Sequence, residues 1–481
     1  MSTIKRLSLG VVCAATFMLL LDVTIVTVAL PDIERDLGAG LSDLQWVTDA
    51  YALTLAALLL TSGVLADRFG RKRLFLAGLA VFTAGSLACA LAQDPTALII
   101  SRAAQGVGGA VLFATSLALL AATFHGRERG VAFGVWGAVT GLATALGPVL
   151  GGVITTGLDW RGVFWVNLPI GVVAFAIGAR YLEESRVPHA HRPDIAGFVT
   201  LTATLAGLVY GLIRASESGW DDRIVIGSFV AAAVLLIAFI VIEHAVAHPM
   251  FDLGLLRIPT FVGGLVAAFA MNGSLFAMLL YVTLYLQNDL QYSALASGVR
   301  LLLMSGIAMI TATIAGRLSA HLPVRWLIGP GLVLVGLGLF TMAGITAADG
   351  WAHLIPGLII AGAGSGLVNP PLASTAVGVV HHRSAGMASG ANTTLRQVGI
   401  AVGIAAYGSI FAAALRNHGA TDGLRTAYAG GLNELFVVSG GLAVLGGLLA
   451  LALIRSRDFV AAAPVQPELD PARPGPEVSQ V

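Results

Sequence analysis

The stretch Ser62-Gly-Val-Leu-Ala-Asp-Arg-Phe-Gly-Arg-Lys-Arg73 connects two long apolar runs of this chain. Within it the acid Asp67 is followed by four cations in six positions, which are Arg68, Arg71, Lys72 and Arg73. Two membrane helices joined by so short a basic loop form a hairpin, and lysine and arginine in short loops favour the cytoplasmic side. Gly63 predicts a close approach of a neighbouring helix, and Gly70 predicts a sharp turn.

The composition places the whole chain in a membrane. Of 481 residues 57% are hydrophobic and 11% charged, whereas soluble domains carry about 25% charged residues. The net charge of +1 gives no reason to expect nucleic acid as a partner. Since a span needs about 20 apolar residues, we predict an all-α polytopic protein of fourteen helices, near 9–30, 46–66, 74–93, 97–123, 130–156, 162–182, 195–214, 224–243, 259–286, 296–319, 325–346, 351–378, 385–415 and 433–454.

The distribution of lysine and arginine predicts the orientation. With the N-terminus inside, 18 of these residues lie at inner ends and loops and 7 at outer ones, while Arg102 and Arg396 remain within spans. This bias indicates a multi-pass protein of the cell membrane with both termini cytoplasmic. The first apolar run lacks a cleavage site, so we interpret it as an uncleaved helix.

The basic loop resembles the signature loop between helices 2 and 3 of the major facilitator superfamily. Seven positions match that pattern, namely Gly63, Leu65, Asp67, Arg68, Gly70, Arg71 and Lys72. The resemblance implies a gating loop. In related transporters the loop acid contacts the start of a helix in the opposite half, which here places Asp67 near residues 384–386 when the outward-facing state forms.

The chain repeats itself. Residues 62–65 realign with 315–318 at an offset of 253, and residues 125–130 realign with 381–386 at an offset of 256. Such repeats indicate two homologous six-helix halves and leave residues 195–243 unpaired. The pattern resembles the fourteen-helix drug:proton antiporters, so we expect a six-helix bundle at 1–186, inserted helices at 187–256, a second bundle at 257–458 and a disordered cytoplasmic tail at 459–481.

Two acids lie within predicted spans of the first half. Asp22 interrupts the apolar span 9–30, and an intramembrane carboxylate has to face a cavity, form a pair or take up a proton. Its surroundings resemble the antiporter motif L-D-x-T-I-V-N-x-A-L-P, with Thr27 in place of the asparagine; a structural hydrogen-bonded role is the alternative. For Asp49, a helix-capping role and a role in proton or cation binding both stay open.

A buried cation is predicted to balance Asp22. Arg102 and Gln105 are spaced i, i+3 and share one face of the helix at 97–123. The stretch resembles the family's R-x-x-Q-G-x-G motif, which implies that Arg102 takes part in proton coupling and that Gln105 faces the substrate site. We expect Asp22 to be the counter-charge of Arg102.

Glycine patterns mark the helix at 130–156. Gly137 and Gly141, and then Gly147 and Gly151, are spaced for close helix contact. The resemblance is to the antiporter motif G-x-x-x-G-P-x-x-G-G, carried here by Gly141, Gly147, Pro148, Gly151 and Gly152. It implies an exporter, although tight packing alone also explains the glycines. The following W-R-x-x-F-x-x-N-x-P stretch at 160–169 is expected to fix the outer end of the helices at 130–156 and 162–182 and is given no chemical role.

The second half carries lone polar groups in apolar spans. The candidates for substrate binding, together with Asp22, Asp49 and Gln105, are Asn272, Asn369, Asn392, Arg396 and Gln397. Pro370 and Pro371 are expected to break the helix at 351–378 and to free carbonyls toward a cavity.

Together these patterns predict a proton-coupled exporter that works by alternating access. The resemblance implies lipophilic, often cationic drugs, dyes or antibiotics as substrates, and protons and membrane lipids as partners of a monomer. The alternatives are a dedicated exporter of one natural product and a membrane receptor or scaffold without transport. No clustered nucleophile, cofactor motif or metal-ligand spacing suggests an enzyme, a cofactor or a metal site.

Overall fold

The computed structural model describes residues 2–186, 193–319, 321–380, 385–418 and 424–459. Fourteen helices in these ranges are long and apolar enough to cross a membrane, which confirms the predicted number. The expected tail at 459–481 lies almost wholly outside the described residues. Two of the fourteen spans each contain two α-helices, α6 with α7 in Gly162–Tyr181 and α10 with α11 in Pro259–Asp289. The α-helices are α1 (Thr3–Leu37), α2 (Leu41–Phe69), α3 (Arg71–Ala90), α4 (Pro95–Thr123), α5 (Gly126–Gly157), α6 (Gly162–Trp165), α7 (Asn167–Tyr181), α8 (Ile195–Ser218), α9 (Arg223–Ala245), α10 (Pro259–Met271), α11 (Ala277–Leu284), α12 (Ala294–Leu318), α13 (Arg325–Met342), α14 (Ile355–Gly378), α15 (Ala385–His418) and α16 (Leu424–Leu453).

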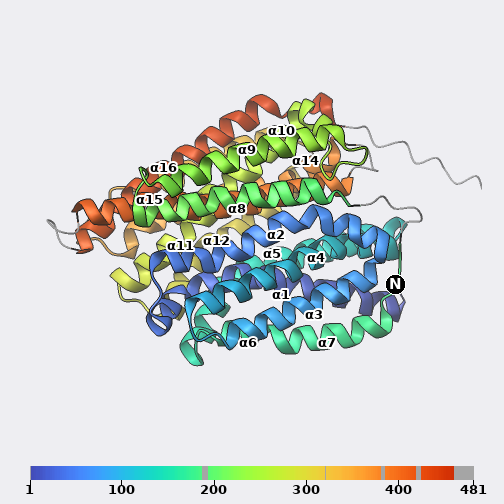
Figure 1. The fold of residues 1–481 in the computed structure, drawn as a ribbon, viewed down its shortest axis with the longest axis horizontal. Coiled ribbons are helices and arrows are strands. Elements are labelled where there is room, and N and C mark those ends of the chain that lie inside the picture. The colour runs from blue at the N-terminus through green and yellow to red at the C-terminus, as the bar shows by residue number, and fades with distance from the viewer. Residues whose placement is uncertain (1, 187–192, 320, 381–384, 419–423, 460–481) are drawn as a thin grey trace, which may run out of the picture.

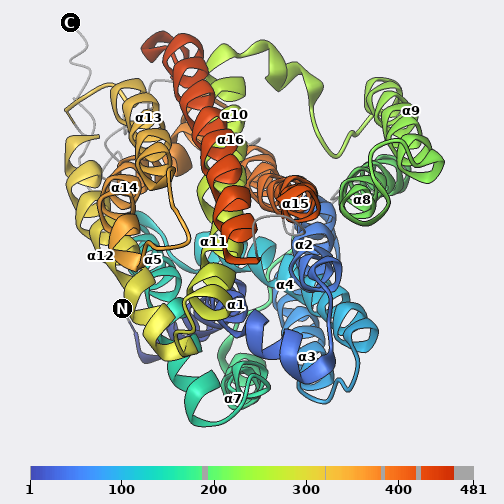
Figure 2. The ribbon, with the colours of Figure 1, turned by 90° about the vertical axis from the view of Figure 1, so that its left-hand side faces the viewer.

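The spans form two helical bundles whose helices run along the long axis of the molecule (Figure 1). In the first bundle, α1–α7, helix α1 packs on α5 and α7, and α4 packs on α2 and α3. In the second bundle, α10–α16, helix α14 packs on α12 and α13, and α10 packs on α15 and α16. Viewed end-on, α2 and α15 meet along one side of the junction, and α5 and α12 meet along another (Figure 2).

Helices α8 and α9, which connect the bundles in the sequence, form a hairpin beside the α2–α15 junction (Figure 2). Helix α8 packs on both α2 and α15, while α9 packs mainly on α8. The Ser409 hydroxyl donates to the carbonyl of Leu212 at 2.5 Å, and Arg416 Nη1 donates to the carbonyl of Ser216 at 2.5 Å. The hairpin therefore covers the junction and is anchored to α15 by side-chain bonds.

The basic loop turns at Gly70, as predicted. Gly70 has a φ of 107°, and a Cβ there would lie 2.6 Å from the Glu184 carboxylate. That carboxylate accepts hydrogen bonds from the backbone N–H groups of Lys72 at 3.1 Å and Arg73 at 3.2 Å, the free donors at the start of α3. The loop is thus attached to the segment that follows α7.

Two expectations about helix geometry are wrong. Helix α14 runs without a break through Pro370 and Pro371, because membrane helices tolerate proline where surrounding groups compensate for the lost donors. No heavy atom of the described residues lies within 4 Å of the position that a Cβ on Gly63 would take, so none of the described helices makes the expected close approach there.

The bundles are joined at the end away from the N-terminus, called here the far end. Asn288 Nδ2 donates to Glu34 at 2.8 Å, and Gln287 Nε2 donates to the carbonyl of Val28 at 2.8 Å. Where α5 crosses α12, a Cβ on Gly298 would lie 2.1 Å from the Pro148 carbonyl oxygen. Toward the N-terminal end, six glycines of α5 and α12 would have no heavy atom of the described residues within 4 Å of an added Cβ, namely Gly130, Gly134, Gly137, Gly141, Gly306 and Gly316. The two helices therefore touch at the far end and separate below it.

A valine at Gly298 should keep the far end from closing. Overpacking a tight contact costs about 1–3 kcal/mol, so the population of the closed far end should fall roughly five- to hundredfold. Spin labels at the exposed positions Val153 and Val299 would report it as a longer distance. The control is Gly306→Val on the same helix, because a side chain at Gly306 would extend into open space among the described residues. Identical distance distributions in both variants would contradict the tight contact.

Candidate functional site

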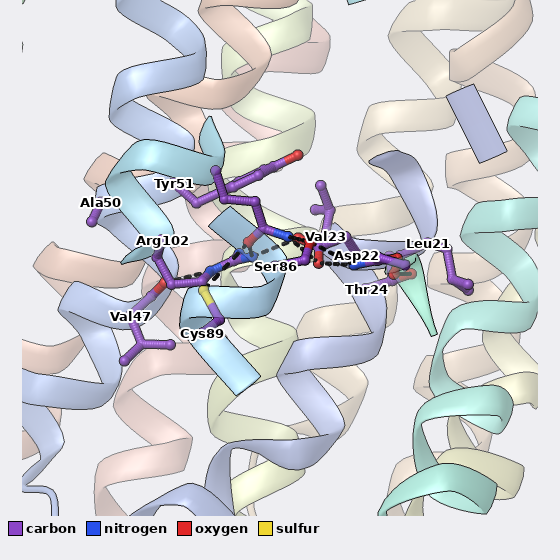
Figure 3. Close-up of polar contacts among 12 residues, drawn as sticks. Leu21, Asp22, Val23, Thr24, Val47, Ala50, Tyr51, Ser86, Cys89 and Arg102 are labelled. Atoms are coloured by element: carbon purple, nitrogen blue, oxygen red, sulfur yellow. Dashed lines mark hydrogen bonds and ion pairs between the residues drawn. The ribbon is translucent and has the colours of Figure 1, made fainter. Parts of the chain in front are cut away.

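Asp22 of α1 and Arg102 of α4 form an ion pair inside the first bundle (Figure 3). Arg102 Nη1 lies 2.5 Å from Asp22 Oδ2, and the two side chains are 2% and 0% exposed. The predicted pairing of these residues is confirmed. Because each charge alone would be costly in a bilayer, the pair explains how both are tolerated within apolar spans.

Two amides complete the surroundings of the Asp22 carboxylate. Gln105 Nε2 donates to Asp22 Oδ1 at 2.8 Å, and Asn167 Nδ2 donates to the same oxygen at 3.0 Å. Both amides also donate to the Ser86 hydroxyl of α3, at 2.8 and 3.2 Å. Four helices, α1, α3, α4 and α7, therefore meet in one buried polar network.

The guanidinium of Arg102 makes further contacts with α2 and α4. Its Nε donates to the Val47 carbonyl at 3.1 Å, and its Nη1 donates to Gln105 Oε1 at 2.6 Å. The Tyr51 ring lies against it, with the ring centroid 4.2 Å from the guanidinium carbon, a distance suited to a cation–π contact. Arg102 consequently connects α4 to α1 and α2.

Asn167 was missed by sequence reasoning, which gave the stretch around it no chemical role. The signal was a lone asparagine within the apolar span 162–182, of the kind that marked Asn272 and Asn369 elsewhere. The same stretch also bonds to α1, because Trp160 Nε1 and Arg161 Nη1 donate to Asp36 at 2.9 and 2.7 Å near the far end of that helix.

Asp49 lies apart from this network. It is fully buried in α2, and neither carboxylate oxygen has a hydrogen-bond partner among the described residues. The capping interpretation is wrong, because α2 begins earlier than expected, at Leu41, and Asp43 supplies the cap by accepting from the Gly40 N–H at 2.9 Å. An unpaired buried carboxylate is costly unless it binds a proton or a cation.

A cavity lies between the two bundles. Its polar lining consists of Thr24, Thr27, Thr48, Tyr51, Arg102 and Gln397, and ten further side chains, nearly all aliphatic or aromatic, complete it. The lining includes no carboxylate. The volume is about 50 Å³, far below the roughly 300–1,000 Å³ of sites for drug-sized ligands, so a substrate has to widen it.

The predicted substrate-binding residues fall into three groups. Gln397 lines the cavity, as does Arg102. Asp22, Asp49 and Gln105 are buried in helix packing, and Asn272 donates to the Ala268 carbonyl of its own helix at 2.9 Å. The third group is a cluster in which Arg396 Nε donates to Asn392 Oδ1 at 3.2 Å and Arg396 Nη1 donates to Asn369 Oδ1 at 3.1 Å.

The predicted gating loop makes its contacts inside the first bundle. Asp67 Oδ1 accepts from Arg71 Nη2 at 2.7 Å, and Arg71 Nη1 donates to the Ala118 carbonyl of α4 at 3.3 Å. Lys72 Nζ donates to the Ala179 carbonyl of α7 at 2.8 Å, while Arg68 lies over the Phe69 ring. The partner position Ser384 expected for Asp67 lies outside the described residues.

The glycine motif of α5 is divided between two contacts. Gly147 and Gly151 lie against Thr24 and Ile25 of α1, and Gly152 lies against Leu295 of α12, each too closely for a Cβ. Gly137 and Gly141 are expected to make such contacts, but no heavy atom of the described residues lies within 4 Å of an added Cβ at either position. That expectation is wrong because α5 and α12 have separated at this level.

Two membrane-spanning bundles around a cavity, with a buried ion pair in its wall, define the architecture of a membrane transporter. A model of the Major Facilitator Superfamily matches residues 12–404, and the chain belongs to this superfamily.

Similar proteins are named for drug resistance. The multidrug resistance protein Stp of Mycobacterium tuberculosis is 35% identical over 82% of this chain and 74% of its own length. The puromycin resistance protein pur8 of Streptomyces alboniger is 35% identical over 97% of this chain and 94% of its own. The fold is shared with a bacterial homologue of the human lysosomal transporter Spinster, with a TM-score of 0.66 and 16% identity over 96% of this chain and all of that one.

Replacing Asn167 by alanine should weaken the polar network. Asp22 and Ser86 each lose a buried donor, so the free energy of unfolding should fall by about 1–3 kcal/mol. Thermal unfolding in detergent micelles measures the loss. Thr200→Ala is the control, because among the described residues the Thr200 hydroxyl bonds only to carbonyls of its own helix. Equal effects of the two substitutions would argue against a structural role of Asn167 in the network.

Proposed function

We propose that this protein exports lipophilic small molecules from the cell in exchange for protons. The observation that supports this most is the Asp22–Arg102 pair, because Arg102 both binds the carboxylate and lines the cavity between the bundles. The family membership and the names of the relatives support transport and drug resistance.

The proposed cycle couples the ion pair to the movement of the bundles. With both termini cytoplasmic, as the positive-inside bias favours, the far end is the outer one, and the described arrangement is closed to the outside. A proton that reaches Asp22 neutralises the carboxylate and releases Arg102, which changes the cavity wall. The entry of one proton contributes about 2.3 kcal/mol per 100 mV of membrane potential. Asp49 is a second candidate to carry a proton.

The range of substrates is a separate part of the proposal. The cavity wall is largely apolar, which suits loose selection among lipophilic molecules. A dedicated exporter of one natural product has the same features. A receptor or scaffold without transport is the alternative from another class, and it would show no proton flux when substrate is added to proteoliposomes. We expect the exporter to act as a monomer in the cell membrane.

Asp22→Asn should abolish transport driven by a pH gradient. The asparagine amide has nearly the shape of the carboxylate and still fits the site, but it cannot take up and release a proton near neutral pH. Efflux of dyes and antibiotics from loaded vesicles, with and without the gradient, is the measurement. Asp32→Asn on the same helix is the control, because among the described residues the only ion-pair partner of Asp32 is Arg35, near the helix end. If the Asp22 variant responded to the gradient as the unmodified protein does, the coupling role would be refuted.

Asp67→Asn should slow transport more than it weakens substrate binding. When the N-terminal end closes, Asp67 is expected to reach the start of α15, where the helix dipole favours an acid. Loss of a contact of that kind should slow transport about two- to thirtyfold, while the dissociation constant stays nearly unchanged. Glu183→Gln, at an exposed acid near the same end, serves as control. A loss of affinity as large as the loss of rate would exclude this gating role.

A further inference from the structure

Arg396 is a cation within the membrane span Ala385–Arg416. Its two hydrogen bonds go to the amide oxygens of Asn392 and Asn369, which are neutral. None of the ion pairs among the described residues includes Arg396. Arg102 in the first bundle, in contrast, is neutralised by Asp22. An uncompensated guanidinium in a span is costly and marks a site where charge is used.

The position of Arg396 connects it to the central cavity. Ile400 and Ile404 line that cavity, and they follow Arg396 by four and eight residues on the same helix face. The neighbouring residue Gln397 also lines it. Because α15 begins at the N-terminal end, Arg396 lies one turn closer to that end, on the proposed cytoplasmic approach to the cavity.

The cluster offers donors in excess of acceptors. Asn392 is 4% exposed, and its oxygen accepts from Arg396, while its Nδ2 has no acceptor among the described residues. Arg396 Nη2 makes no hydrogen bond there, since the side chain bonds through Nε and Nη1. An arginine fork beside an unpaired amide donor suits an oxyanion, which accepts several hydrogen bonds at once.

We infer that Arg396 and Asn392 form a subsite for the acidic group of the exported molecule. A carboxylate, phenolate or enolate would bind the two side chains, and its apolar body would occupy the cavity beside Phe276, Leu279 and Ile400. The inference rests on the proposed export function and names its substrate class as lipophilic organic acids, in place of the lipophilic cations that the family resemblance implies. The lining without a carboxylate agrees with this class.

The inference has an electrical consequence. Exchange of one cation for one proton moves no net charge, whereas the exit of an anion against the entry of a proton moves two charges in the same sense. Each charge is worth about 2.3 kcal/mol per 100 mV. Export of an acid should therefore respond to membrane potential as well as to the pH gradient.

Binding of three matched probes to the full-length protein in phosphatidylcholine nanodiscs tests the subsite directly. The probes are pyrenebutanoic acid, its methyl ester and pyrenebutylamine, which share the apolar body and differ in charge. At neutral pH the acid should bind about tenfold or more tightly than the other two, as expected for hydrogen bonds to a charged group. Arg396→Gln should weaken acid binding roughly 10- to 100-fold and leave the ester within about twofold.

Further variants separate recognition from folding. Arg396→Lys should keep part of the preference, because the charge stays while the fork is lost. Arg300→Gln is the matched control. Arg300 is an arginine of α12, and its guanidinium lies over the Tyr292 ring. Should Arg396→Gln fail to fold, Asn392→Asp places an acid next to Arg396 and should lower acid affinity while raising amine affinity.

Several outcomes would overturn the subsite. Equal binding of acid and amine would do so, as would an equal loss of acid and ester binding in Arg396→Gln, which would indicate a structural role. Competition by added phosphatidylglycerol would assign the site to a lipid headgroup instead of a substrate. Selective acid binding without efflux from loaded vesicles would refute export and leave the subsite intact, whereas efflux that prefers the amine would refute the subsite alone.

Discussion

A charged group in the interior of a bilayer has to find its partners within the protein, because no water is available there. The Asp22–Arg102 pair meets this requirement by drawing α1, α3, α4 and α7 around one buried network, to which Gln105, Asn167 and Ser86 contribute. The first bundle is consequently organised about a charge as much as about apolar packing. Because Arg102 also forms part of the cavity wall, a change in that network alters the wall of the cavity where a substrate would bind.

The buried arginines of the two bundles have different hydrogen-bond partners. Arg102 of the first bundle has a carboxylate partner, whereas Arg396 of the second bonds to amide oxygens alone. The first arrangement suits the uptake and release of a proton, since proton and cation compete for one carboxylate. The second leaves a positive charge available to a ligand. This asymmetry between the two bundles is the physical basis for the proposal that the first couples transport to protons and the second recognises the substrate.

Closure at the far end depends on close backbone contact and on a few hydrogen bonds. Glycines allow α5 to touch α1 and α12 at this end. Nearer the N-terminal end, glycines of α5 such as Gly134 and Gly141 make no close contact with the described residues. Asn288 and Gln287 add hydrogen bonds between the bundles, and neither of these bonds is an ion pair. Contacts of this kind separate at modest cost, as the proposed alternating access requires. The α8–α9 hairpin stays over the α2–α15 junction, where it bonds to α15.

The number of spans, the turn at Gly70 and the pairing of Asp22 with Arg102 followed from the sequence, because apolar length, glycine and isolated charges in spans are local signals. Only the tertiary structure decided that Asn167 joins the network, that Asp49 is buried without a partner, and that Gln397 reaches the cavity. Local signals also failed at Gly63, Gly141 and Pro370. Which face of a helix meets a neighbour depends on the rotation and separation of whole helices, and these are set by packing between segments far apart in the chain.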